Sequence, residues 1–103
     1  MVTEELGGNI VLDKFRLDPE EMVVAKKMIG KYAEKIQHIT DYNELKLEMK
    51  SHLKGQNKHF EMKCHVLFDG GKAISEAEGI NPFVMIDEVL QKVIQELQHK
   101  IKK

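Results

Sequence analysis

Two long segments in the middle of this chain alternate apolar and polar residues, and this alternation limits the fold more than any other feature. Residues 45–53 alternate leucine, methionine and serine with charged side chains, and residues 60–68 repeat the pattern with phenylalanine, methionine, cysteine and valine. A period of two is typical of a strand with one buried and one solvated face. The intervening Gly-Gln-Asn-Lys, residues 55–58, is typical of a turn. These segments therefore predict an antiparallel hairpin with one apolar face.

The alternation also predicts a register for this hairpin. If residues 56–57 form the turn, Leu53 faces Phe60, and the apolar side chains of both strands share one face. In this register Lys50 lies opposite Lys63. Like charges placed opposite each other destabilise a sheet slightly, and a polyanionic partner would relieve the repulsion.

Helical periodicity flanks the hairpin on both sides. Residues 18–21, Asp-Pro-Glu-Glu, predict a helix start, because the aspartate caps free N–H groups, the proline suits the first position and the second glutamate completes a capping box. Apolar residues then recur every three or four positions as far as His38. Residues 81–82, Asn-Pro, start a second helix by the same logic. The apolar stripe of this second helix comprises Ile86, Val89, Leu90, Val93, Leu97 and Ile101.

Two shorter strands complete the pattern, one over residues 9–15 and one over residues 73–78, after a turn at residues 69–72. The order is β-α-β-β-β-α. The sequence therefore predicts an α+β domain, a four-stranded and mostly antiparallel sheet with two helices packed on one face. We expect a single domain over residues 1–103, with residues 1–8 as a flexible N-terminal tail.

Composition favours a soluble globular protein. The chain is 42% hydrophobic and 32% charged. No apolar run approaches the roughly 20 residues that span a bilayer, and the N-terminus lacks the features of a secretory signal. The single cysteine excludes an internal disulfide and fits a reducing compartment. We therefore expect a cytoplasmic protein without a membrane partner.

Cys64 and the histidines near it are the one cluster typical of metal or nucleophilic chemistry. The alternation, however, points Cys64 towards the core and His52 and His65 towards solvent, so they do not converge easily on one ion. A buried structural thiol is the favoured interpretation, because burial in apolar surroundings makes cysteine a poor nucleophile.

Catalytic motifs are otherwise mostly missing. The chain has no phosphate-binding loop, dinucleotide fingerprint, nucleophile elbow or zinc-protease motif. Glu76 and Glu78 could flank a cleft, but two glutamates on one strand face are more typical of a solvated sheet surface. We therefore expect no enzymatic activity, no cofactor, no metal and no small-molecule substrate.

The lysines carry more information, although the net charge is −1 and any basic surface must be a local patch. No aromatic residue is expected on the polar sheet face, so RNA contacts would go to phosphates rather than to stacked bases. Ordinary solvated charges remain the alternative interpretation. The candidate RNA-binding residues are Lys50, Lys54 and Lys63 on the hairpin, Lys27, Lys31 and Lys35 on the first helix, and Lys92 and Lys100 on the second.

Several segments resemble the ribosome hibernation-promoting factor family, also called ribosome-associated inhibitor A or protein Y. Residues 85–97, Met-Ile-Asp-Glu-Val-Leu-Gln-Lys-Val-Ile-Gln-Glu-Leu, resemble that family's second helix, in which an Ala-Ile-Asp segment precedes an apolar stripe, a lysine and a later Gln-Leu. Phe83 matches the family's aromatic position before it. Residues 60–79 are also similar, with an Asp-Gly-Gly turn and an Ala-Glu-Gly ending. The resemblance covers residues 9–101, of which residues 9–36 match in order and length more than in sequence.

The resemblance implies a protein that binds the small ribosomal subunit near the decoding site and mRNA channel and blocks translation in stressed or resting cells. Family helices present basic residues to ribosomal RNA, which implicates Lys92 most directly and then the three lysines of the first helix. Where the family often has further basic residues, this chain has Gln95 and His99. We expect a ribosome-associated, translation-modulating protein that binds small-subunit ribosomal RNA without catalysis. The alternative is a protein-interaction or dimerisation domain, pairing as a homodimer through an exposed sheet edge, with no RNA binding.

Overall fold

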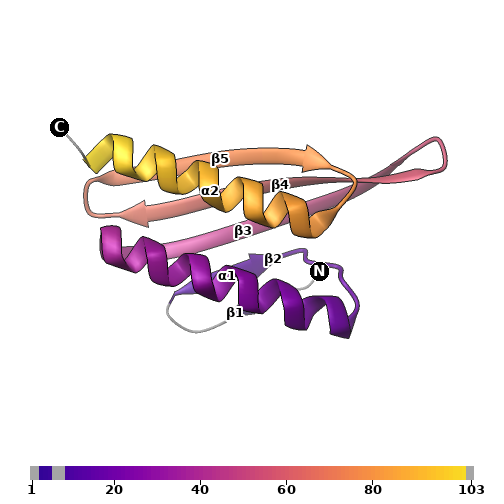
Figure 1. Cartoon of the computed structure of the whole chain (residues 1–103), viewed down its shortest axis with the longest axis horizontal. Helices are drawn as coiled ribbons and strands as arrows, with labels where there is room; N and C mark the ends of the chain where they lie inside the picture. The colour runs from indigo at the N-terminus through magenta and orange to yellow at the C-terminus, as the bar shows by residue number, and fades with distance from the viewer. Residues whose placement is uncertain (1–2, 6–8, 102–103) are drawn as a thin grey trace.

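The computed structural model describes residues 3–5 and 9–101 and has the α+β architecture expected from the sequence (Figure 1). From β2 to α2 the order is the predicted β-α-β-β-β-α, and the two helices lie side by side on one face of the sheet. The elements are β1 (Thr3–Glu5), β2 (Ile10–Asp13), α1 (Pro19–Ile39), β3 (Tyr42–Lys54), β4 (Asn57–Phe68), β5 (Gly71–Gly79) and α2 (Pro82–Ile101).

The sheet has the strand order β1-β2-β3-β4-β5, and its pairs are antiparallel except for the parallel pair β2–β3. The parallel pair follows from α1, which carries the chain back across the sheet between the two strands. The sequence predicted four strands, and β1 adds a fifth at the edge. Residues 3–5, expected in a flexible tail, instead pair with β2, while residues 1–2 and 6–8 of that tail lie outside the described residues.

The β3–β4 hairpin turns at residues 55–56, so that Ser51 rather than Leu53 lies opposite Phe60. The predicted turn, one position later along the chain, was therefore wrong. Gly55 has a φ of 63°, and a two-residue hairpin turn with glycine at its first central position accommodates such a value without strain. The register differs by two residues, an even number, so the predicted assignment of side chains to the two faces is confirmed.

The true register removes the like-charge pair expected on this hairpin. Lys50 lies opposite Glu61, and Lys63 lies between Glu48 on β3 and Glu76 on β5. Lys63 Nζ is 3.9 Å from Glu76 Oε1. Opposite charges on neighbouring strands stabilise a sheet. The expected repulsion between Lys50 and Lys63, and its relief by a polyanion, was therefore wrong.

Both helices begin at the predicted caps. In α1, Asp18 Oδ1 accepts a hydrogen bond from Glu21 N at 2.9 Å, and Asp18 N donates to Glu21 Oε1 at 3.1 Å, which completes the capping box. In α2, Asn81 Oδ1 accepts from Phe83 N at 2.9 Å. Helix α1 ends at Ile39, one residue beyond the predicted end.

The core lies between the apolar face of the sheet and the apolar faces of both helices. Of the predicted stripe on α2, only Ile101 in the last turn is exposed. Among the described residues Ser75 is the one buried polar side chain, and its hydroxyl donates to the Val89 carbonyl oxygen at 2.6 Å. The largest fully buried side chains are Leu12, Ile29, Ile36, Leu45, Leu47, Met49, Met62, Val66, Met85, Ile86, Leu90 and Leu97.

The capping box gives a direct test of this helix start. Replacing Asp18 with alanine should lower the free energy of unfolding by about 1 kcal/mol, because an N–H group at the start of α1 loses its acceptor. Urea unfolding followed by circular dichroism measures the change. Asp18→Asn keeps a capping oxygen and should retain most of the stability. Equal losses in both variants would contradict the capping role.

Candidate nucleic-acid interface

The open face of the sheet, the one without helices, carries charges of both signs. Neighbouring strands place opposite charges together: Lys63 lies 3.9 Å from Glu76, and Lys14 at the end of β2 lies 3.8 Å from Glu48. By their place in the alternation and by these ion pairs, carboxylates and lysines point to this face in equal numbers. The residues concerned are Asp13, Glu44, Glu48, Glu61, Glu76 and Glu78, with Lys14, Lys46, Lys50, Lys54, Lys63 and Lys72.

The like-charge pairs on this face are acidic. Glu61 lies opposite Glu78 across β4 and β5, and Asp13 lies opposite Glu48 across β2 and β3. Glu61 is also 3.4 Å from the imidazole of His52, measured between Oε2 and Nδ1. The open face therefore offers a polyanion no excess of positive charge.

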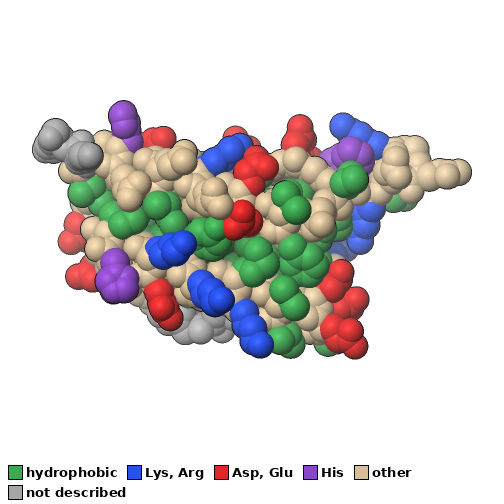
Figure 2. Space-filling model, in the orientation of Figure 1, with side chains coloured by type: hydrophobic (Ala, Val, Ile, Leu, Met, Phe, Trp, Pro, Cys, Tyr) green, Lys and Arg blue, Asp and Glu red, His purple; other side chains and the backbone are tan. Residues whose placement is uncertain are grey.

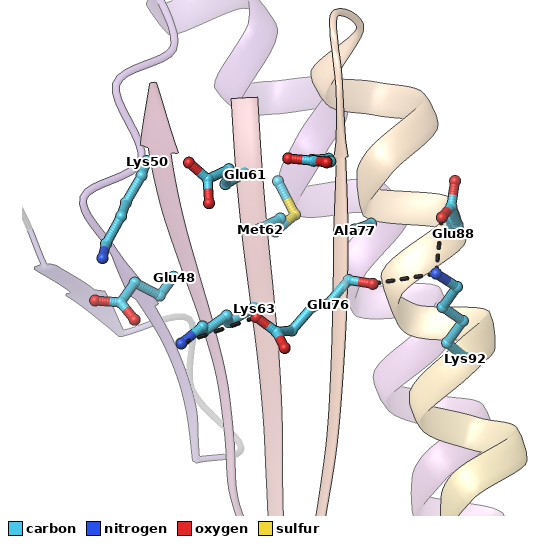
Figure 3. Close-up of a pocket in the computed structure, with 10 residues that line it drawn as sticks. Glu48, Lys50, Glu61, Met62, Lys63, Glu76, Ala77, Glu88 and Lys92 are labelled. Carbon is cyan, nitrogen blue, oxygen red and sulfur yellow. Dashed lines mark hydrogen bonds and ion pairs between the residues drawn. The ribbon is translucent and has the colours of Figure 1, made fainter. Parts of the chain in front are cut away.

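A shallow cavity of about 550 Å³ lies over β3, β4 and β5 and reaches α2 (Figure 3). Glu76 and Glu78, the glutamates considered as catalytic candidates, both line it together with Lys63 and Lys92. Figure 3 shows the Glu76 side chain directed towards Lys63, while its backbone carbonyl faces Lys92. Glu76 is thus engaged by lysines from two sides.

Lys92 joins α2 to the edge of the sheet. Its ammonium group donates to the Glu76 carbonyl oxygen at 3.1 Å and lies 3.0 Å from Glu88 Oε2. Lys100 lies 3.7 Å from Glu96 Oε1 in the same i,i+4 arrangement. Both lysines of α2 named as candidates are therefore paired with carboxylates, and Lys92 also satisfies a carbonyl of the edge strand β5.

The opposite flank of α2 faces α1 through a polar cluster. The Tyr32 hydroxyl donates to the Asp87 carboxylate, and Gln91 Nε2 donates to Asp87 Oδ2 at 2.9 Å and to the Tyr32 oxygen at 3.2 Å. Burial first, and the hydrogen bond to Asp87 second, raise the pKa of Tyr32. The sequence pattern placed Tyr32 on the apolar face of α1 and gave no signal for its partner. This cluster fixes the position of the two helices relative to each other.

Lys27, Lys31 and Lys35, here called the α1 row, are exposed and follow one another at intervals of four residues along α1. The rise between successive members is about 6 Å. Figure 2 shows lysine side chains spaced along this helix on the exposed side of the helix layer. Residues 22–39 contain four lysines and one glutamate.

The α1 row differs in its partners from Lys63, Lys92 and Lys100, the candidate lysines that are paired with carboxylates. Within the described part of the chain, the ammonium groups of Lys27 and Lys31 form no hydrogen bond or ion pair. Lys35 Nζ lies 5.0 Å from the centre of the Tyr32 ring, a cation–π contact that leaves its charge uncompensated. This row is a basic surface on the helix side of the protein that no carboxylate compensates within the described residues.

The structure therefore separates the predicted RNA-binding lysines into three groups. The α1 row lies on one flank of α2, and the two lysines of α2 lie on the other, towards β5. Lys50 and Lys63 lie on the open face, and Lys54 lies near the tip of the hairpin. No single surface contains all of them, which sequence positions alone could not reveal.

The cysteine–histidine cluster is separated as the alternation predicted. Cys64 is fully buried on the helix side of β4, and burial raises the pKa of its thiol. His52 and His65 point to the open face. Over residues 9–101, no group of three or more histidine, cysteine, aspartate or glutamate side chains is placed to hold a metal ion.

In comparisons with known proteins, no protein-family model and no curated sequence matches this chain. Neither α1 nor the described length of α2 combines the length and apolar character needed to cross a membrane. A functional inference for this chain therefore rests on its own side chains and their geometry.

The burial of Cys64 predicts its reactivity. In the folded protein the thiol should react with an aromatic disulfide reagent at least about a hundredfold more slowly than in guanidinium, because reaction requires opening of the core. Raising the pH from about 7 to about 9 should speed the native reaction roughly tenfold or more, since the thiolate is the reactive form and the thiol of the opened state has its ordinary pKa. Reaction at the same rate in both states would show that β4 is accessible.

Proposed function

We propose that this chain is a ribosome-associated, translation-modulating protein that binds small-subunit ribosomal RNA and acts by occupying RNA surface, without catalysis. The observation that carries the proposal is the α1 row. Its lysines are exposed, evenly spaced and not paired with carboxylates, in contrast to Lys63, Lys92 and Lys100. Exposed lysines of this kind bind phosphates by releasing counterions.

The binding expected of such a row is electrostatic and responds to RNA shape more than to base sequence. Lysine contacts to phosphates position a protein without reading bases. Three phosphate contacts predict roughly a 20- to 40-fold loss of affinity between about 50 and 200 mM salt. A near-neutral chain can bind in this way because the α1 row is a local patch of positive charge, even though α1 as a whole contains four lysines and three glutamates.

The resemblance to the hibernation-promoting factors supports the same surface. In that family the helices face ribosomal RNA, and here the α1 row lies on the exposed side of the helix layer. Lys92, which the resemblance implicates most directly, is already bonded to Glu76 and Glu88. We therefore assign the primary contact to the α1 row and give Lys92 a structural role at the sheet edge.

The alternative of pairing through a sheet edge has less support. Along β5, the exposed positions that alternate with buried ones are charged at Lys72, Glu76 and Glu78 and apolar at Ile74, and charges on an edge strand discourage pairing with another strand. The Glu76 carbonyl at this edge also accepts a hydrogen bond from Lys92, which an incoming strand would have to displace.

Cosedimentation with purified small ribosomal subunits tests the proposal. The variant in which Lys27, Lys31 and Lys35 are all glutamine should bind at least about tenfold more weakly at 100 mM salt and show a shallower salt dependence. The control variant replaces Lys46, Lys63 and Lys72 with glutamine, which removes the same charge from the open face. Equal binding by the wild type and the α1 variant would refute the proposal. It would also be refuted if the folded wild type did not pellet with the subunits at about 50 or about 200 mM salt.

A further inference from the structure

The β3–β4 hairpin continues well beyond the rest of the sheet. On one side β5 ends at Gly79, opposite Phe60, and on the other side β2 pairs with β3 only as far as Glu48. Residues 52–59, here called the arm, therefore form a two-stranded ribbon with no neighbouring strand, and Figure 1 shows it projecting past the helices.

The core does not explain the length of the arm. None of its side chains is buried, and Leu53 is 72% exposed. A two-stranded hairpin without further cover is marginally stable in water. A ribbon that projects without adding to the core is well placed to contact another molecule.

The composition of the arm indicates which kind of molecule the arm would contact. Residues 52–59 contain two lysines and two histidines and no carboxylate. The two cations lie on opposite faces: alternation along the strands directs Lys54 to the open face and Lys58 to the helix side. The arm thus presents positive charge in both directions, whereas the α1 row presents it in one.

Contacts at the base of the arm hold it in line with the sheet. The rings of His52 and His59 stack across the strands with centroids 6.0 Å apart, and His52 Nδ1 lies 3.4 Å from Glu61 Oε2. On the helix side, Lys58 Nζ lies 5.4 Å from the centre of the Phe60 ring. These contacts join the arm to the last residues that the other strands support.

We propose that the arm inserts between two phosphate backbones of a folded RNA, at a helical groove or junction. This inference rests on the proposed function and names the kind of RNA that the protein recognises. Lysines on both faces suit a slot with phosphates on both walls, and Leu53 near the tip offers an apolar contact to riboses or base edges. A single strand fits less well, because the arm has no phenylalanine, tyrosine or tryptophan on which bases could stack, and its two histidine rings stack on each other.

Three variants of the full chain distinguish the contribution of the arm to binding from that of the rest of the protein. The first deletes Leu53, Lys54, Asn57 and Lys58, two residues from each strand, so the turn at residues 55–56 is retained and follows His52 directly. Removing an even number per strand preserves which side chains face the core. The second variant, Lys54→Gln with Lys58→Gln, keeps the length of the arm in case the deletion impairs folding. The control, Lys46→Gln with Lys72→Gln, removes the same charge from the sheet outside the arm.

Fluorescence anisotropy would then measure binding to small ribosomal subunits, to a labelled RNA stem-loop and to oligouridine of equal length, over a range of salt. We expect both arm variants to bind subunits and stem-loop roughly tenfold more weakly, with the slope of log affinity against log salt smaller by between about one and two. Their binding to oligouridine should equal that of the wild type, and the control should behave like the wild type throughout.

Each contrary result has a distinct meaning. If both arm variants bind subunits and stem-loop like the wild type while the α1 variant is impaired, the role of the arm is refuted and the proposed function stands. If the arm variants lose affinity equally for stem-loop and oligouridine, insertion between two backbones is refuted. If the folded wild type binds no small subunits, the proposed function fails and the inference fails with it.

Discussion

The pairing of β3 with β4 determines where every other element of this protein lies. It is the longest pairing in the sheet, and it places Leu47, Cys64 and their neighbours on one face and charged side chains on the other. The apolar face requires cover, which α1 and α2 supply together. Strands β2 and β5 extend the sheet on either side of this pair. The arm exists because the β3–β4 pair continues beyond the ends of both of these strands.

The same pairing also decides where positive charge is available. Across β3, β4 and β5 it puts Lys63 between two glutamates and Lys50 opposite Glu61, so these two lysines have carboxylates on neighbouring strands. The α1 row has no such neighbours. A chain with a net charge of −1 can therefore present a basic surface, because neutrality is reached on one face of the molecule and not on the other.

The features predicted correctly from the sequence are those with local causes. A capping box needs only Asp18 and Glu21, and the face assignment of a strand needs only its alternation. The hairpin register was wrong by two residues because a shift by an even number of residues leaves the alternation of apolar and polar faces unchanged. The positive φ of Gly55 identifies which of the permitted turns forms. Strand β1 was missed because three residues are too few to show a period, and its partner β2 supplies the pairing.

The candidate site was predicted less completely than the fold, because several of its contacts join residues that are far apart in the sequence. Residue types and spacing identified the α1 row, because a helix fixes the positions of its own side chains. The carboxylates that pair with Lys92 and Lys100 lie only four residues away, but other polar partners lie far along the chain: Glu76 is 16 residues from Lys92, and Asp87 is 55 residues from Tyr32. Such contacts depend on how the helices pack on the sheet, which local sequence patterns do not predict.

The α1 row and the arm belong to different elements of one packed domain, and this has a consequence for recognition. The cluster of Tyr32, Asp87 and Gln91 fixes α1 against α2, and the continuous β3–β4 pairing fixes the arm against the sheet. Two basic contacts held at a constant separation bind strongly only to an RNA whose phosphates match that geometry. Selectivity would then arise from RNA shape, although no single lysine on either element distinguishes one sequence from another.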